Sequence, residues 1–125
     1  MTVAVVVACA AVARRDVEEA IRTEADPARV VVGLGLIEGQ NLVTSAGAVV
    51  LFLGEESILS GEAHSRADIN LPGAQAELVR RVRETGRPVI AVIMAGRPLT
   101  LTNIIDDVDA ILYAWHPGTM GGAAI

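Results

Sequence analysis

Five short apolar runs, rich in Val, Ile and Leu, alternate with polar or amphipathic segments, and this alternation limits the possible folds more than any other feature of the chain. The runs cover residues 3–8, 29–34, 48–53, 88–94 and 109–113. Strands of a parallel sheet are near-continuous apolar runs, because both faces of such a sheet are covered. Strands that alternate with helices predict a parallel sheet joined by right-handed crossovers.

The intervening segments predict the helices of such a fold. Residues 14–25 carry apolar positions at helical spacing, and residues 72–85 form the clearest helix, with Pro72 in its first turn and Gly86 at its C-terminal end. Weaker helical segments are expected at residues 37–46 and 102–107, and a glycine-rich loop at residues 118–122. Residues 1–125 are therefore expected to form a single α/β domain, a flavodoxin-like doubly wound three-layer sandwich with a five-stranded, mostly parallel sheet.

The longest loop of this predicted fold, residues 54–70, follows the third strand. Ligands of doubly wound sheets bind at the C-terminal ends of the strands, so this loop is the first place to look for a site. It contains seven polar side chains that could take part in acid/base chemistry or binding: Glu55, Glu56, Glu62, His64, Ser65, Arg66 and Asp68. The residues alone favour a solvated, charged loop in which Arg66 pairs with a carboxylate, over a set of general acid/base groups.

Composition excludes several classes of function. The net charge of −5 gives a nucleic-acid backbone no electrostatic attraction, and no apolar run is long enough to cross a membrane. All ten basic residues are Arg, which removes lysine chemistry and with it a phosphorylated receiver domain. The first strand lacks the glycine- and hydroxyl-rich loop of a flavin site, and Cys9 alone forms no intrachain disulfide. We expect no cofactor and no metal.

Three long stretches, in order and correctly spaced, resemble the C-terminal domain of family 3 glycoside hydrolases, the β-glucosidase family. They read AGAVVLFLGEESILSGEAHSRADINLPGAQAELV, TGRPVIAVIMAGRPLTL and VDAILYAWHPGTMGGAAI. The resemblance is strong over residues 46–125 and looser over residues 1–45, where ACAAVARRD stands in place of the family's Gly-Pro turn. It implies a domain that is incomplete at its C-terminus, as in a fragment or an engineered derivative.

The resemblance also implies a retaining β-glycosidase mechanism, which uses two carboxyl groups about 5 Å apart. In this family the nucleophile is an aspartate on a separate N-terminal barrel domain, and the acid/base is the glutamate of a Ser-Gly-Glu-Ala-x-Ser-Arg motif. That glutamate is Glu62 here, and its neighbours His64, Ser65 and Arg66 become candidates for substrate binding or loop support. The implied partners are the barrel domain and a β-glucoside or oligosaccharide. The compartment, whether cytoplasmic, periplasmic or extracellular, stays open.

Residues around this motif receive structural roles. Glu55 is expected to cap the loop by accepting backbone N–H bonds, and Arg97 is a candidate anchor for the Glu62 loop or for the domain interface. Arg66 should face away from the Glu62 carboxylate or bind sugar hydroxyls, and Trp115 should pack on the barrel-facing surface. A non-catalytic or engineered flavodoxin-like scaffold derived from the same domain remains the alternative to a catalytic role.

Overall fold

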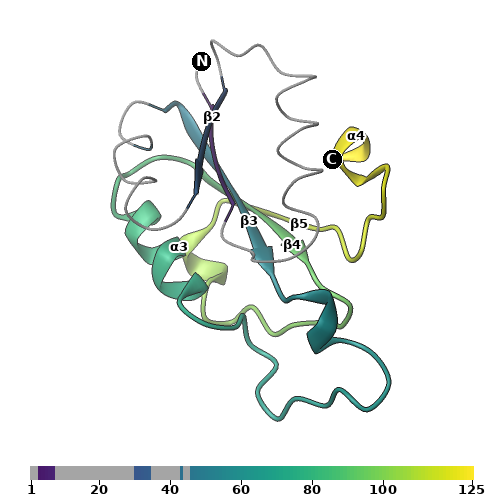
Figure 1. Cartoon of the computed structure of the whole chain (residues 1–125). Coiled ribbons are helices and arrows are strands. Elements are labelled where there is room, and N and C mark those ends of the chain that lie inside the picture. The colour runs from purple at the N-terminus through teal and green to yellow at the C-terminus, as the bar shows by residue number, and fades with distance from the viewer. Residues whose placement is uncertain (1–2, 8–29, 35–42, 44–45) are drawn as a thin grey trace.

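A parallel sheet forms the centre of the molecule (Figure 1). The computed structural model describes residues 3–7, 30–34, 43 and 46–125. The sheet order is β2-β1-β3-β4-β5, and every neighbouring pair is parallel. The strands, each of which coincides with a predicted apolar run, are β1 (Val3–Val7), β2 (Val30–Leu34), β3 (Ala48–Gly54), β4 (Val89–Met94) and β5 (Ala110–Tyr113). The predicted parallel α/β sheet is confirmed.

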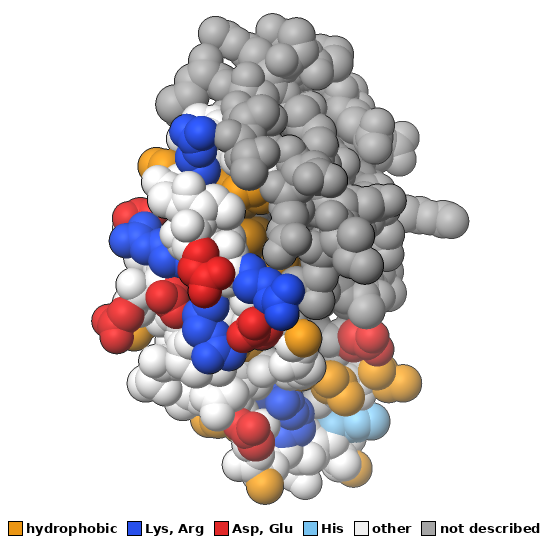
Figure 2. Space-filling view, turned by 90° about the vertical axis from the view of Figure 1, so that its left-hand side faces the viewer, with side chains coloured by type: hydrophobic (Ala, Val, Ile, Leu, Met, Phe, Trp, Pro, Cys, Tyr) orange, Lys and Arg blue, Asp and Glu red, His pale blue; other side chains and the backbone are white. Residues whose placement is uncertain are grey.

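The helix α3 (Gln75–Arg83) covers part of this sheet. Its buried residues Leu78, Val79 and Val82 are the apolar face that the sequence predicts, and they join a core that includes residues of β3, β4 and the segments around them. Burying a side chain of this size contributes about 1.5–3 kcal/mol, so this face fixes the helix on the sheet. The outer face carries charges: Glu77 pairs with Arg80 and Arg81, and Figure 2 shows acidic and basic side chains interspersed there.

The start of α3 differs from the prediction, which placed Pro72 in the first helical turn. The helix begins at Gln75, because Gly73 has a φ of +64° and cannot continue a right-handed helix. The Gln75 side chain bonds to both backbone groups of Gly54, accepting from N–H at 2.8 Å and donating to C=O at 2.7 Å. Gln75 therefore ties the first turn of α3 to the end of β3. Gly86, with a φ of +71°, follows the helix as predicted.

Shorter elements complete the described chain. They are the 3₁₀ turns η1 (Ser57–Leu59) and η2 (Ile105–Asp107) and the short helix α4 (Gly121–Ala124). The helical turn expected within residues 102–107 is present as η2, whereas the loop expected at residues 118–122 gives way to α4 from Gly121. The helix expected at residues 14–25, most of the one at 37–46, and Cys9 lie outside the described residues. Within the described part, no helix has the length and hydropathy needed to cross a membrane.

The C-terminal ends of β3, β4 and β5 meet at one edge of the sheet, where the candidate loop begins. The N–H of Glu55 bonds to the carbonyl of Met94, and the N–H of Ala95 bonds to the carbonyl of Trp115. At this point Gly54 has a φ of +146°, and a Cβ there would lie 1.8 Å from the carbonyl oxygen of Met94. Only glycine lets the chain leave β3 this close to β4.

Asp109 holds the N-terminal ends of β4 and β5 together. Its carboxylate accepts the N–H of Val89 at 2.8 Å and the guanidinium of Arg83 at 3.0 Å. The bond from Val89, aided by the bond and charge of Arg83, lowers the pKa of Asp109 from its ordinary value of 3.8. The ionised carboxylate thus links α3, β4 and β5.

We predict that Gly54→Ala lowers the free energy of unfolding by about 3 kcal/mol or more, since it combines an unfavourable φ with a backbone clash. Gly73→Ala is the matched control: its φ is also positive, at +64°, but its Cβ would meet nothing within 4 Å. We expect it to cost about 1 kcal/mol. Urea unfolding of both variants checks the prediction, and equal losses would contradict it.

For Asp109→Asn we predict a loss of stability at neutral pH that shrinks as the pH falls. A group whose folded-state pKa is lowered stabilises the fold above its unfolded-state pKa, and this contribution disappears as the pH falls through the folded-state value. The difference between the two proteins should therefore be largest above pH 3.8 and decline below it. Urea unfolding across that range measures it, with the exposed Asp106→Asn as control. A difference that does not depend on pH would refute the role given to Asp109.

Candidate functional site

A buried carboxylate lies at the base of the loop that follows β3. Glu55 is 2% exposed as a residue, and its side chain is fully buried. One carboxylate oxygen accepts Nη1 of Arg66 at 2.7 Å, and the other accepts Nε of Arg97 at 2.9 Å. Burial of a charge without partners would be very costly, and both oxygens here have a cationic partner. We call Glu55, Arg66 and Arg97 together the Glu55 clamp.

The two arginines of the clamp reach different parts of the loop. Nη2 of Arg97 donates to the backbone carbonyls of Leu59 and of His64, the latter at 2.8 Å. Nη2 of Arg66 donates to the carbonyl of Asn70 at 3.3 Å. One guanidinium therefore joins the two ends of the segment 60–63, and the other holds the end of the loop.

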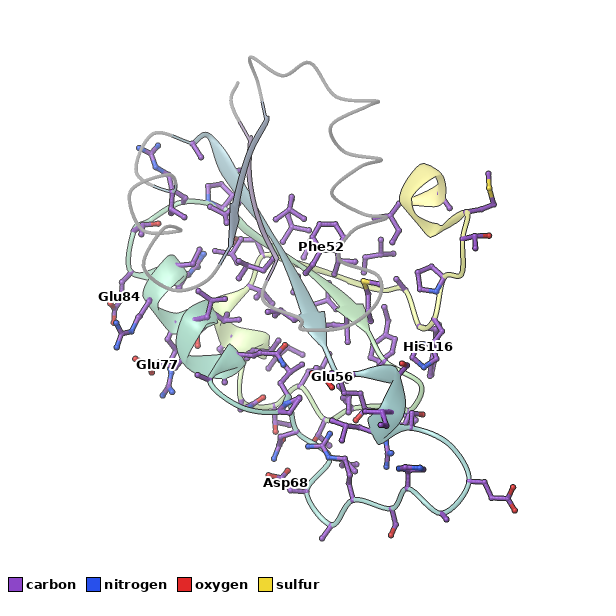
Figure 3. All side chains as sticks on the ribbon, in the orientation of Figure 1. Phe52, Glu56, Asp68, Glu77, Glu84 and His116 are labelled. Carbon is purple, nitrogen blue, oxygen red and sulfur yellow. The ribbon has the colours of Figure 1, made fainter. Side chains whose placement is uncertain are left out.

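The returning limb of the loop is fixed to the chain that follows β4. The side chain of Asn70 bonds to Asp68 and to the hydroxyl of Thr100, and the N–H of Thr100 donates to the carbonyl of Ile69. In Figure 3, Asp68 lies on this limb, while Glu56 lies near η1. Both limbs of the loop are thus attached to the same edge of the sheet.

The tip between these attachments is open to solvent. Glu62, His64 and Ser65 are exposed, and Glu62 stands between Gly61 with a φ of +134° and Ala63 with a φ of +63°. A non-glycine residue at positive φ is uncommon and costs energy, so the neighbouring structure must hold Ala63 in this conformation. Figure 1 shows the loop extending beyond the end of the sheet, away from α4. The exposed Glu62 therefore belongs to a loop that projects from the end of the sheet.

The loop after β5 carries an aromatic and an imidazole side chain, Trp115 and His116. A Cβ on Gly96 would lie 2.1 Å from Oγ of Ser60 and 2.5 Å from Nε2 of His116, so this glycine lets the loops after β3, β4 and β5 pack closely. Trp115 is 51% exposed, has a φ of +56°, and its ring lies 4.7 Å from that of Tyr113. Packing of Trp115 on a barrel-facing surface stays a prediction.

The structure corrects one expected contact and confirms others. Among the described residues, the donors to the Glu55 carboxylate are the guanidinium groups of Arg66 and Arg97 and not the expected backbone N–H groups, because the side chain of Glu55 is buried beside these two arginines. Arg66 does pair with a carboxylate, and that carboxylate is Glu55. Arg97 anchors the loop.

In the residues that the structure describes, no three His, Cys, Asp or Glu side chains form a group that could hold a metal ion.

Two supporting residues were not identified from the sequence. Gln75 braces Gly54, and the hydroxyl of Tyr113 donates to the carbonyl of Arg97 at 2.6 Å while accepting the N–H of Leu99 at 2.9 Å. Tyr113 therefore holds the backbone of Arg97 in place. Its position at the C-terminal end of β5, opposite Ile93, which comes just before the segment that carries Arg97, is the signal that could have identified it.

Known proteins are similar to this chain in sequence. A family model, the glycosyl hydrolase family 3 C-terminal domain, matches residues 4–125. The chain is 38% identical over 91 residues to a β-xylosidase of Formosa agariphila and 40% identical over 88 residues to a periplasmic β-glucosidase of Salmonella typhimurium. These matches cover 73% and 70% of the chain but only 13% and 12% of those proteins. The chain thus spans a small part of the length of these relatives.

A solved structure is also similar. A β-glucosidase from Listeria innocua, in complex with isofagomine, superposes with a TM-score of 0.85 at 30% sequence identity. The superposition covers 97% of this chain and 20% of that one. Sequence and structure agree, and the chain belongs to the glycosyl hydrolase family 3 C-terminal domains.

Proposed function

We propose that this domain supplies the catalytic acid/base, Glu62, to a retaining β-glycosidase whose nucleophile lies on a separate barrel domain. The observation that carries the proposal is the contrast within one loop. Its base is held by a buried carboxylate with two guanidinium partners, and its tip presents an exposed carboxyl group. An acid/base that enters another domain's site needs a firm attachment and a free end.

The chemistry requires one carboxyl group with two successive tasks. In the first step Glu62 donates its proton to the glycosidic oxygen while the nucleophile attacks the anomeric carbon. In the second step the resulting carboxylate takes a proton from water, which then releases the sugar. The first step needs the protonated form of Glu62, and the second needs its carboxylate.

The residues next to Glu62 have supporting roles in this proposal. Arg66 turns back into the Glu55 clamp, so we assign it to loop support rather than to sugar binding. His64 and Ser65 are exposed beside the tip and are candidates for contact with substrate or with the barrel. The Asp68, Asn70 and Thr100 contacts hold the returning limb.

The substrate class follows from the relatives. Matching proteins are named β-glucosidases and β-xylosidases, so we propose a β-linked glucoside or xyloside, including short oligosaccharides. We further propose that the whole domain has flavodoxin-like, doubly wound layering. The sheet order β2-β1-β3-β4-β5 supports this, because it places the first strand between the second and third and so reverses the direction of winding.

The chain alone should have no measurable glycosidase activity. It contributes one carboxyl group of the pair, and loss of the nucleophile costs several orders of magnitude in rate. The measurement is hydrolysis of an aryl β-glucoside and an aryl β-xyloside by the pure chain. The same domain joined to a family 3 barrel domain is the positive control. Clear turnover by the chain alone would contradict the proposal, and an inactive joined protein would favour a non-catalytic scaffold.

In the joined protein, Glu62→Gln should lower kcat/KM about a hundred- to ten-thousand-fold for substrates with poor leaving groups. The loss should be far smaller for activated aryl glycosides, because an acidic phenol departs without a proton. A series of aryl glycosides with leaving groups of increasing basicity measures this, since kcat/KM reports on the first chemical step.

Glu56→Gln is the matched control for this series, because it changes an exposed carboxyl of the same loop near its fixed base. It should leave the dependence on the leaving group unchanged. The assignment of Glu62 would be wrong if Glu56→Gln showed the stronger dependence, or if Glu62→Gln slowed every substrate equally.

A further inference from the structure

The tip that carries Glu62 is closed by a single side-chain nitrogen. Nη2 of Arg97 donates to the carbonyls of Leu59 and His64, which are the residues on either side of the segment 60–63. The remaining backbone contacts of the tip are short-range turns, such as the bond from the N–H of His64 to the carbonyl of Gly61 at 3.2 Å. Arg97 therefore provides the described long-range hydrogen bonds that flank this segment, which also packs against Gly96 through Ser60.

Arg97 is itself held at two points, one on its side chain and one on its backbone. Its Nε donates to the buried carboxylate of Glu55, and its own carbonyl accepts the hydroxyl of Tyr113. Its side chain is 19% exposed. A guanidinium that is fixed at its backbone and at Nε has little freedom left, so the position of Nη2 is determined by β3, β4 and β5 together.

From this geometry we propose that Arg97 is a positioning residue for catalysis: it sets the place of the Glu62 carboxyl by closing the tip across Leu59 and His64. This rests on the proposed function of Glu62. A general acid acts only within hydrogen-bond reach of the leaving oxygen, and a displacement of about 1 Å can cost about a hundredfold in rate. The effect of Arg97 should therefore appear in the step that needs the proton.

Arg66 offers a matched comparison, because it shares the charge partner but not the contact with the tip. It donates to the same Glu55 carboxylate, and its side chain is also 19% exposed. Its second bond goes to the carbonyl of Asn70, at the end of the loop. Replacing either arginine by lysine keeps a cation near Glu55 but loses the planar fork that bonds several acceptors at once.

The experiment compares Arg97→Lys, Arg66→Lys and Glu62→Gln in the domain joined to its barrel domain, with the aryl glycoside series. We expect Arg97→Lys to lower kcat/KM about ten- to a hundredfold for poor leaving groups and much less for activated ones. For Arg66→Lys, any loss of kcat/KM should be the same for all substrates of the series, whatever their leaving group. Amide hydrogen exchange should rise at residues 61–64 in Arg97→Lys and not in Arg66→Lys.

Each result decides the matter. A uniform loss in Arg97→Lys, or the same pattern in both lysine variants, overturns the role of Arg97 and leaves the proposed function intact if Glu62→Gln still shows leaving-group dependence. If Glu62→Gln shows none, the proposed function fails and this inference fails with it. Should Arg97→Lys not fold, Tyr113→Phe removes the hydroxyl that holds the Arg97 carbonyl. Tyr113→Phe should then lower kcat/KM less than Arg97→Lys was expected to, with the same dependence on the leaving group. An equal loss of kcat/KM for every substrate would again overturn the proposal.

Discussion

The buried charge of Glu55 constrains the whole edge of the sheet. A carboxylate with a fully buried side chain must have cationic or hydrogen-bonding partners, since removing it from water costs several kcal/mol. Its partners come from the loop itself, as Arg66, and from the chain after β4, as Arg97. Burial of this one charge therefore couples the loop to the core. A buried ion pair need not add net stability, but it does fix which segments lie together.

That coupling explains how the loop of residues 54–70 can be fixed at both ends and still be accessible to solvent. The clamp, the Gln75 brace on Gly54 and the Asn70–Thr100 contacts hold its two limbs. Glu62, His64 and Ser65 remain exposed between these attachments. In the proposed function, this arrangement places the Glu62 carboxyl away from the core of its own domain, where a second domain would complete the site. Two non-glycine residues at this end of the sheet, Ala63 in the loop and Trp115 after β5, have positive φ and therefore carry local backbone strain.

The sequence predicted the elements that depend on local pattern. The apolar runs became strands within a residue or two of their expected bounds, and the apolar face of α3 was correct. The start of α3 was wrong because the left-handed turn at Gly73 outweighs the preference of Pro72 for a first helical turn. The pairing of Arg66 with a carboxylate was predicted from the loop, but the second partner of Glu55 was not, because Arg97 is 42 residues away and meets Glu55 only through the pairing of β3 with β4. Glu62 itself was singled out by its motif, since nothing in its local pattern separates it from Glu56.

The most direct test of the central claim is the product that Glu62→Ala forms in the presence of azide, with the domain joined to its barrel domain. Azide attacks a glycosyl-enzyme intermediate without needing a base, so it bypasses the second task assigned to Glu62. With an activated aryl β-glycoside as substrate, the account predicts faster turnover with added azide and a β-configured glycosyl azide, identified by NMR. An α-configured azide would instead mark the loss of a nucleophile. No glycosyl azide from Glu62→Ala, or its formation by Glu56→Ala, would contradict the account.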